Sequence, residues 1–382
     1  MKAKLTSALL ALLVVAAVPT GVGAAGTAQA ECSFPVTATD ATGTEVTVDE
    51  RPERVTTLSP SAAQTMWEIG GESQVVGLSE HALYLDGAAE RTNVSAAGEG
   101  RISVEKVVST QPNLVLAPNV ISNDTVTKLR EAGLTVYKFG FAASIDDIYA
   151  KTEVTGELTG NCEAADETVT SMRDRIATVQ EAVENSERPG VFVSVGGGYT
   201  AGDGTFINSM VELAGGTNVA VEANVSGYQT ISEEIIVQQD PEWIVELGAF
   251  GAYPKTDAYN GTHAVQNGQV MTVSNQNISQ PAPRVVNAIV RMADAFHPEA
   301  YAEANATETT ATETTATETT AIETTETAET ATTALTTDES AMADATTETT
   351  TESGGASGGV PGFGVPAALA ALAGAALLAG RR

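Results

Sequence analysis

Two short stretches of the sequence follow one template, and each places a glutamate at the same point. Residues 103–116 (SVEKVVSTQPNLVL) and 232–245 (SEEIIVQQDPEWIV) begin 129 positions apart. Each has a Ser, then Glu105 or Glu234 two residues later, apolar residues at helical spacing, and a Pro before an apolar run. A first-turn glutamate behind a Ser cap offsets the helix dipole, and an exposed carboxylate there is also available for a salt bridge. The repeat alone favours the helix-dipole role.

Strand and helix patterns alternate around these stretches. The alternation runs from about residue 54 to 142 and restarts after residue 189, which predicts mostly parallel sheets covered on both faces. Between them, residues 163–185 carry apolar residues at spacings of three and four, which predicts one amphipathic helix of about six turns. We therefore predict an α/β fold of two lobes, 31–142 and 189–300, joined by a linking helix region at 143–188.

The start of the chain indicates export. Residues 1–30 contain early lysines, an apolar run and the sequence Ala28-Gln29-Ala30, which together are typical of a secretory signal peptide. The two cysteines, Cys32 and Cys162, lack the close spacing of a redox or metal pair, so we expect a disulfide between them.

The charge of the chain excludes some partners. Acidic residues number 49 against 19 basic ones, for a net charge of -30. This balance argues against nucleic acid and against attraction to anionic lipid, and it is typical of proteins from salt-loving archaea. Surface glycosylation is expected at the N-x-S/T sequons, which are Asn93, Asn123, Asn224, Asn260, Asn277 and Asn305.

The C-terminal part has a composition of its own. Residues 301–358 are rich in Thr and Glu, which predicts a disordered stalk. Residues 359–382 contain Pro361-Gly362-Phe363, an apolar stretch and two terminal arginines. This tail resembles the PGF-CTERM sorting signal of archaeal surface proteins. The resemblance implies cleavage by an archaeosortase and anchoring to the outer face of the membrane, and an uncut tail would itself be a membrane anchor.

The folded part, about residues 52–298, resembles the periplasmic-binding-protein family for vitamin B12, iron-siderophores and haem, especially its cobalamin-binding members. The resemblance rests on RPERVTTLSPSAAQTMWEIGG, ISVEKVVSTQPNLVLAP, GGYTAGDGTFINSMVELAGGTNV, ISEEIIVQQDPEWIV and QPAPRVVNAIVRM. It implies a binding protein without catalysis or a cofactor, which delivers its ligand to the permease dimer and ATPase of an ABC importer. In that family one glutamate of each lobe docks on the permease, and the matching positions are Glu105 and Glu234.

The resemblance places the ligand in a cleft between the lobes, where loops follow the carboxyl ends of the strands. The candidate ligand-binding residues are Tyr84, Tyr199, Tyr228, Phe250 and Arg284. Tyrosine suits a large, flat, partly polar ligand, and Arg284 could bond an amide, carboxylate or phosphate. Where cobalamin-binding members have tryptophans, this chain has 96–98 (AAG) and 118–119 (PN). This departure weakens the vitamin B12 assignment and leaves a siderophore or haem as alternatives. Tyr84, Tyr228 and Arg284 keep the positions that match the cobalamin-binding pattern, so a corrinoid is favoured.

Other classes of function have less support. His81, His263 and His297 lack metal-ligand spacing, so we expect no metal site. The stretch GGGYTA fits G-x-G-x-x-A, but a helix should begin within that motif, and GDGT delays the helix to about Asn208. We therefore predict a loop there and not a dinucleotide-binding enzyme. A structural or adhesive surface protein would also explain the stalk, sequons and anchor.

Overall fold

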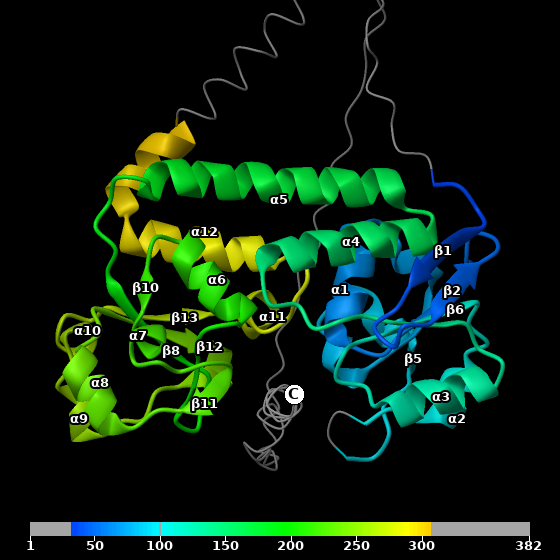
Figure 1. Cartoon of the computed structure of the whole chain (residues 1–382), viewed down its shortest axis with the longest axis horizontal. Coiled ribbons are helices and arrows are strands. Elements are labelled where there is room, and N and C mark those ends of the chain that lie inside the picture. The colour runs from blue at the N-terminus through cyan, green and yellow to red at the C-terminus, as the bar shows by residue number, and fades with distance from the viewer. Residues whose placement is uncertain (1–31, 99–100, 307–382) are drawn as a thin grey trace, which may run out of the picture.

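The computed structural model describes residues 32–98 and 101–306. The predicted signal peptide, the stalk from residue 307 onward and the Pro361-Gly362-Phe363 tail lie outside this part. Figure 1 shows two α/β bodies side by side, which we call the N-lobe and the C-lobe, with helix α5 lying across both. No helix in the described residues is both long and apolar enough to cross a membrane.

Five parallel strands form the N-lobe sheet in the order β5-β4-β3-β6-β7. Strand β6 is buried along its whole length, as expected for a strand covered on both faces. The elements of this lobe are β3 (Val55–Thr57), α1 (Pro60–Glu68), β4 (Val75–Leu78), β5 (Thr92–Asn93), α2 (Val104–Ser109), β6 (Leu114–Ala117), α3 (Asn123–Glu131) and β7 (Val136–Lys138).

The C-lobe repeats this plan with four parallel strands in the order β10-β8-β12-β13 and adds a separate antiparallel pair, β9 and β11. Its strands are β8 (Gly190–Ser194), β9 (Tyr199–Ala201), β10 (Thr217–Asn218), β11 (Tyr228–Thr230), β12 (Trp243–Leu247) and β13 (Val270–Val273). Its helices are α6 (Phe206–Leu213), α7 (Val219–Glu222), α8 (Glu233–Gln239), α9 (Asp257–Asn260), α10 (His263–Gln266), α11 (Asn275–Ile278) and α12 (Val285–Phe296). Residues 298–306 are also helical and bury Ala304, so the folded part continues past the stalk boundary that the sequence predicts.

The linking region contains two helices, where the sequence predicts one. Helix α5 (Cys162–Val183) corresponds to the predicted helix, and α4 (Ile145–Thr159) precedes it. A capping box between Ser144 and Asp147 starts α4. Gly160 ends it with a φ of 73°, and a side chain there would collide with Arg51. The two helices therefore form a hairpin, and α5 runs from the N-lobe to the C-lobe (Figure 1).

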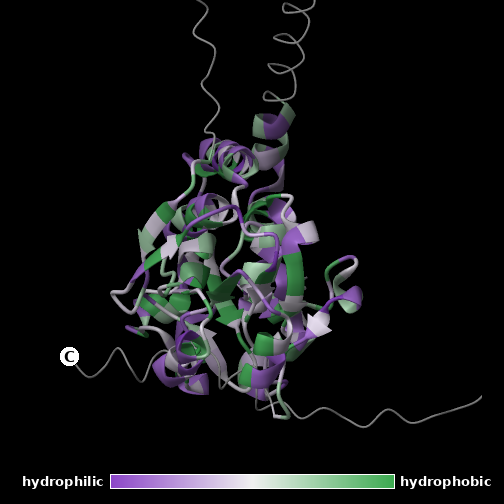
Figure 2. Cartoon of the chain, turned by 90° about the vertical axis from the view of Figure 1, so that its right-hand side faces the viewer, coloured by the Kyte–Doolittle hydropathy of each residue, from purple (hydrophilic) through white to green (hydrophobic). Residues whose placement is uncertain are grey.

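The apolar residues are concentrated inside the molecule, as Figure 2 shows. One continuous core joins the C-lobe to the linking helices and includes Ile148 of α4 and Ile176 of α5. The N-lobe has two cores of its own, and the linking helices add Leu158 and Ala165 to one of them. Most of the buried apolar surface of the helical pair thus belongs with the C-lobe.

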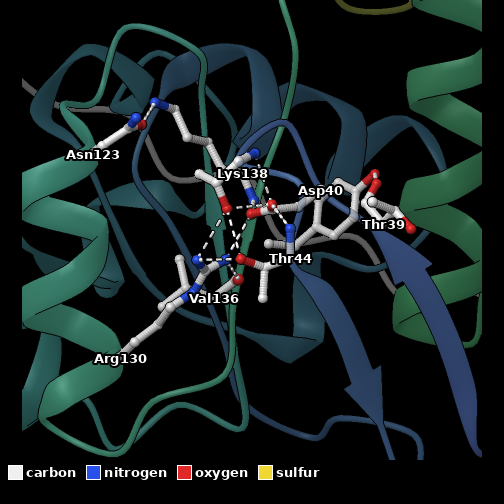
Figure 3. Close-up of polar contacts among 9 residues, drawn as sticks. Thr39, Asp40, Thr44, Asn123, Arg130, Val136 and Lys138 are labelled. Carbon is white, nitrogen blue, oxygen red and sulfur yellow. Dashed lines mark hydrogen bonds and ion pairs between the residues drawn. The ribbon is translucent and has the colours of Figure 1, made fainter.

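A β-hairpin that the sequence pattern does not predict is attached to the N-lobe through Asp40. Its strands are β1 (Val36–Thr39) and β2 (Glu45–Val48). The carboxylate of Asp40 accepts hydrogen bonds from Thr42 and Thr44, and its Oδ2 lies 2.6 Å from the Arg130 guanidinium (Figure 3). The backbone N–H of Lys138 donates to the same oxygen. Burial opposes ionisation, but these hydrogen bonds outweigh it and lower the pKa of Asp40.

Cys32 and Cys162 form a disulfide in the structure, with their Cα atoms 5.5 Å apart. The bond ties the segment before β1 to the first residue of α5. The N-terminal segment is thus joined to the linking helices covalently.

Candidate ligand-binding and docking surfaces

The carboxyl ends of the strands carry most of the large apolar side chains that are exposed. In the described part of the chain six such side chains are exposed, and four of them follow strands. The four are Leu83 after β4, Val120 after β6, Phe141 after β7 and Phe250 after β12. Apolar side chains kept in water at the ends of strands are typical of a ligand-contacting surface. Of the four, only Phe250, which is 59% exposed, is among the ligand-binding residues predicted from the sequence.

The two lobes meet at a polar junction centred on Gln64, which is fully buried in α1. Its Nε2 donates to the Tyr84 hydroxyl at 2.8 Å and to the backbone oxygen of Gln276 at 2.9 Å. Its Oε1 accepts from the backbone N–H of Arg284. Because α1 follows β3 and residues 276–284 follow β13, this junction joins loops at the carboxyl ends of both sheets.

Tyr84 and Arg284, two of the predicted ligand-binding residues, are used in this junction. The Tyr84 hydroxyl donates to Gln280 at 2.8 Å, and burial raises the pKa of the phenol, which keeps the donor proton in place. The Nε of Arg284 donates to Glu68 at 2.7 Å. Both side chains therefore connect the lobes, and the Arg284 charge is already paired.

Lys151 of α4 extends the junction and is buried. Its Nζ donates to Ser61 Oγ at 3.0 Å and to the backbone oxygen of Pro281 at 2.8 Å, so it bonds to both lobes. The ammonium lies 5.2 Å from the ring centre of Phe139. Burial lowers the pKa of Lys151 to about 7.

The two tyrosines predicted in the C-lobe lie on the β9–β11 pair and differ in exposure. Tyr199 is half-buried and packs against the C-lobe core. Tyr228 is only 5% exposed, and its hydroxyl has no hydrogen-bond partner in the described residues. Burial raises the pKa of Tyr228. Of the five predicted ligand residues, Phe250 presents the largest accessible surface.

The glycine-rich stretch after β8 is a turn. Gly196, Gly197 and Gly198 all have positive φ, and the chain turns from β8 directly into β9. A Cβ on Gly196 would collide with the Phe250 carbonyl oxygen, so the turn packs tightly on the 3₁₀ helix at Gly248–Gly251. The next helix, α6, begins only at Phe206 behind the Thr205 cap. This geometry differs from a dinucleotide-binding loop, in which the helix starts within the motif.

A metal site and an enclosed pocket are two other kinds of site that a protein of this size can hold. In residues 32–98 and 101–306 no group of three or more His, Cys, Asp or Glu could hold a metal ion. A pocket of about 530 Å³ lies between α4, α5 and α6. In its wall Arg173 stacks on Tyr149 at 4.8 Å and pairs with Glu153 at 3.3 Å, so its charge is already satisfied.

The repeated sequence units fold alike. Ser103 caps α2 and Ser232 caps α8, so Glu105 and Glu234 both stand at the second helical position and are exposed. The backbone N–H of Glu105 and the Ser103 hydroxyl, whose Oγ donates at 2.9 Å, lower the pKa of Glu105. Figure 1 shows α2 and α8 at the same side of the molecule, opposite α5.

The match extends to the backbone after each helix. Gln111 and Asp240 hold equivalent positions, with φ of 46° and 41°. Each is followed by a proline and then by a strand, β6 or β12. In the described residues only one other non-glycine has a positive φ, so the shared conformation is a distinctive part of the unit.

Known proteins resemble the chain in sequence and in fold. The cobalamin-binding protein of Halobacterium salinarum is 47% identical over 281 residues, which are 71% of this chain and 76% of that protein. The periplasmic vitamin B12-binding protein BtuF of Vibrio cholerae matches 64% of this chain and 97% of its own, with a TM-score of 0.56 and 23% identity. The periplasmic heme-binding protein RhuT from Roseiflexus sp. RS-1 matches 65% and 99%, with a TM-score of 0.59 and 21% identity.

The two solved structures establish the fold, and the sequence establishes the family. Residues 55–276, more than half of the chain, match the family described as periplasmic binding protein. The match includes both parallel sheets and the helical pair between them. The chain belongs to the periplasmic binding protein family.

Proposed function

We propose that this chain is the substrate-binding protein of an ABC importer and that it captures a corrinoid. The observation that carries the proposal is the set of exposed apolar side chains at the strand ends of both lobes, which are Leu83, Val120, Phe141 and Phe250. Such side chains suit the flat face of a macrocycle. The 47% identity to the Halobacterium salinarum cobalamin-binding protein supports the choice of ligand.

The proposed activity is capture without chemical change. The ligand binds between the lobes, and the loaded protein carries it to a permease. The α4–α5 hairpin is packed into cores of both lobes, so closure around the ligand is expected to be small. The buried junction at Gln64 and Lys151 holds the lobes at a fixed distance beneath the ligand.

Titration with cyanocobalamin tests the ligand. The full exported chain in concentrated salt is titrated by calorimetry, and the Phe250→Ser variant is expected to bind at least about tenfold more weakly because it loses a large apolar contact. Val237→Ser is the matched control, since Val237 is 57% exposed but lies on α8. Equal affinity of the wild-type chain and the Phe250→Ser variant would contradict the proposed site.

We propose that Glu105 and Glu234 dock the protein on the two subunits of the permease. Both are exposed on matching helices at one side of the molecule (Figure 1). Charge reversal at both positions is expected to abolish uptake in cells while leaving cyanocobalamin affinity unchanged. A large loss of affinity in this double variant would refute the separation of docking from ligand binding.

Haem is the second candidate ligand, and a ferric siderophore is the third. The exposed imidazole of His81, two residues before Leu83, favours haem because it could approach an iron atom at the strand ends. The same calorimetric titration with ferric haem and with a ferric hydroxamate distinguishes the three. Binding of none of them would favour the non-transport surface protein.

We propose further that the chain is exported, glycosylated and anchored at the outer face of the membrane. The disulfide supports export, because disulfides persist in oxidising compartments. Five of the six sequon asparagines, Asn93, Asn123, Asn224, Asn260 and Asn305, are exposed. Mass spectrometry of the protein from its own cells is expected to show a start after Ala30 and an end near Pro361-Gly362-Phe363. An intact C-terminus would argue for a plain membrane anchor in place of archaeosortase processing.

A further inference from the structure

The two repeated sequence units, residues 103–116 and 232–245, each expose a valine near the glutamate that we propose as a docking residue. Val108 on α2 is 38% exposed and Val237 on α8 is 57% exposed, and both are among the six exposed large apolar side chains of the described residues. These are the two of the six that do not follow the carboxyl end of a strand. They occupy equivalent positions in the two units, and each lies three residues after the docking glutamate.

Val108 and Val237 are exposed for the same structural reason in both repeated units. The residue before each valine, Val107 or Ile236, is completely buried and fixes the helix on its lobe. With that residue turned inward, the glutamate and the valine three positions later lie on the same outer face. A single exposed valine needs no explanation, but two at equivalent positions beside equivalent carboxylates do.

We propose that Val108 and Val237 are contact residues of the docking surface, so that each lobe presents a carboxylate and an apolar side chain one helical turn apart. The matching partner surface has a cationic side chain next to an apolar patch, and it occurs twice. The partner is therefore a pair of equivalent subunits, here the two permease subunits. This inference rests on the proposed function and adds the apolar half of the contact.

Charge argues against a second copy of this chain as the partner. The chain has a net charge of -30, and α8 carries Glu233 beside Glu234. Pairing two such surfaces would place carboxylates against carboxylates, which is unfavourable. A cationic partner removes that repulsion and allows the valines to come into contact.

The test measures association of the full chain with its permease–ATPase complex in lipid nanodiscs, beside calorimetric titration with cyanocobalamin. Val108→Gln and Val237→Gln are each expected to weaken association about fivefold, and the double variant about 25-fold, with cyanocobalamin affinity unchanged. Glutamine is a good helix former, so the helices are retained. Ala177→Gln, on the exposed side of α5 at the opposite side of the molecule, is the matched control.

The outcomes separate the inference from the proposed function. If the valine variants associate like wild type while Glu105→Gln and Glu234→Gln weaken association, the apolar contact is wrong and the docking glutamates stand. If the glutamate variants also associate like wild type, the docking proposal itself fails. A loss of association in the Ala177→Gln control equal to that of the valine variants would likewise overturn the inference.

Discussion

The two lobes are attached to the linking helices by different kinds of interaction. The C-lobe shares a continuous apolar core with most of α4 and α5, including Met172 and Ile176. The N-lobe shares only a few apolar residues with them. Its other attachments are the buried lysine of the junction and the disulfide, which joins α5 to the segment before the β1–β2 hairpin; the Asp40 cluster in turn holds that hairpin on the N-lobe. Apolar packing is insensitive to pH and redox state, whereas the attachments of the N-lobe depend on both. The helical pair therefore behaves as part of the C-lobe. The attachment of the N-lobe to this pair is the one that a change of pH or reduction of the disulfide can weaken.

Loss of the disulfide is expected to have the largest effect. Cys32→Ser combined with Cys162→Ser should lower the free energy of unfolding by about 4 kcal/mol, because the bond closes a long loop. Amide hydrogen exchange should rise in β1 and β2 and stay unchanged in α12. Comparable exchange increases in both lobes would break the proposed asymmetry.

Shortening a side chain in the core that α4 and α5 share with the C-lobe tests the apolar attachment of that lobe. Ile176→Ala should cost about 3 kcal/mol, because it leaves a cavity where α5 packs on the C-lobe. Chemical denaturation measures the loss, and exchange should increase in α5 and α12 together. The exposed Ala177, changed to Ser, is the neighbouring control and should be nearly neutral. Exchange that increases in the N-lobe first would contradict the assignment of the helical pair to the C-lobe.

Asp40→Asn should destabilise the protein by about 2 kcal/mol, since Arg130 loses its charged partner. The pKa of Asp40 is lowered in the folded protein, so its contribution is present above the ordinary carboxyl pKa and is lost as the pH falls through the folded value. Acid denaturation followed by circular dichroism should show this loss in wild type and less of it in the variant. Equal acid sensitivity of wild type and variant would show that Asp40 does not contribute to the pH dependence of stability.

The smallest expected effect, taken per pH unit, concerns Lys151. Its pKa falls to about 7 in the folded protein, so the unfolded chain binds more protons between pH 7 and the ordinary lysine pKa. Stability should therefore rise with pH in that window, by at most about 1.4 kcal/mol per pH unit. Lys151→Met should abolish the slope in denaturation curves taken from pH 7 to 10. If Lys151→Met retains the slope of the unfolding free energy against pH, other groups cause that slope.

The sequence predicts the helices whose apolar spacing is regular and misses the one whose buried side is polar. Apolar residues at helical spacing predict α5 and, within the repeated units, α2 and α8. Helix α4 was missed because it buries Thr152, Thr155 and Thr159, whose hydroxyls donate to carbonyls four residues earlier. Such residues look exposed in a sequence pattern, and only their partners within the helix show that they can be buried.

The sequence predicts which loops are candidates for ligand binding, and it does not predict which of their side chains are available to a ligand. The principle that ligands bind at the carboxyl ends of strands leads to the loops that hold Phe250 and Tyr84. Whether a tyrosine or an arginine there remains available depends on residues far along the chain. Arg284 pairs with Glu68, 216 positions away, and no local pattern reveals that partner.

The left-handed residues Gln111 and Asp240 connect the two repeated helices to strands of the two sheets. Each stops its helix after two turns or fewer and connects it through a proline to a central strand. The far end of each strand leads to an exposed apolar side chain, Val120 after β6 and Phe250 after β12. Because each helix is short and a proline follows its last residues, a displacement of the two glutamates by a bound partner is expected to be transmitted along β6 and β12 to the loops proposed to bind the ligand.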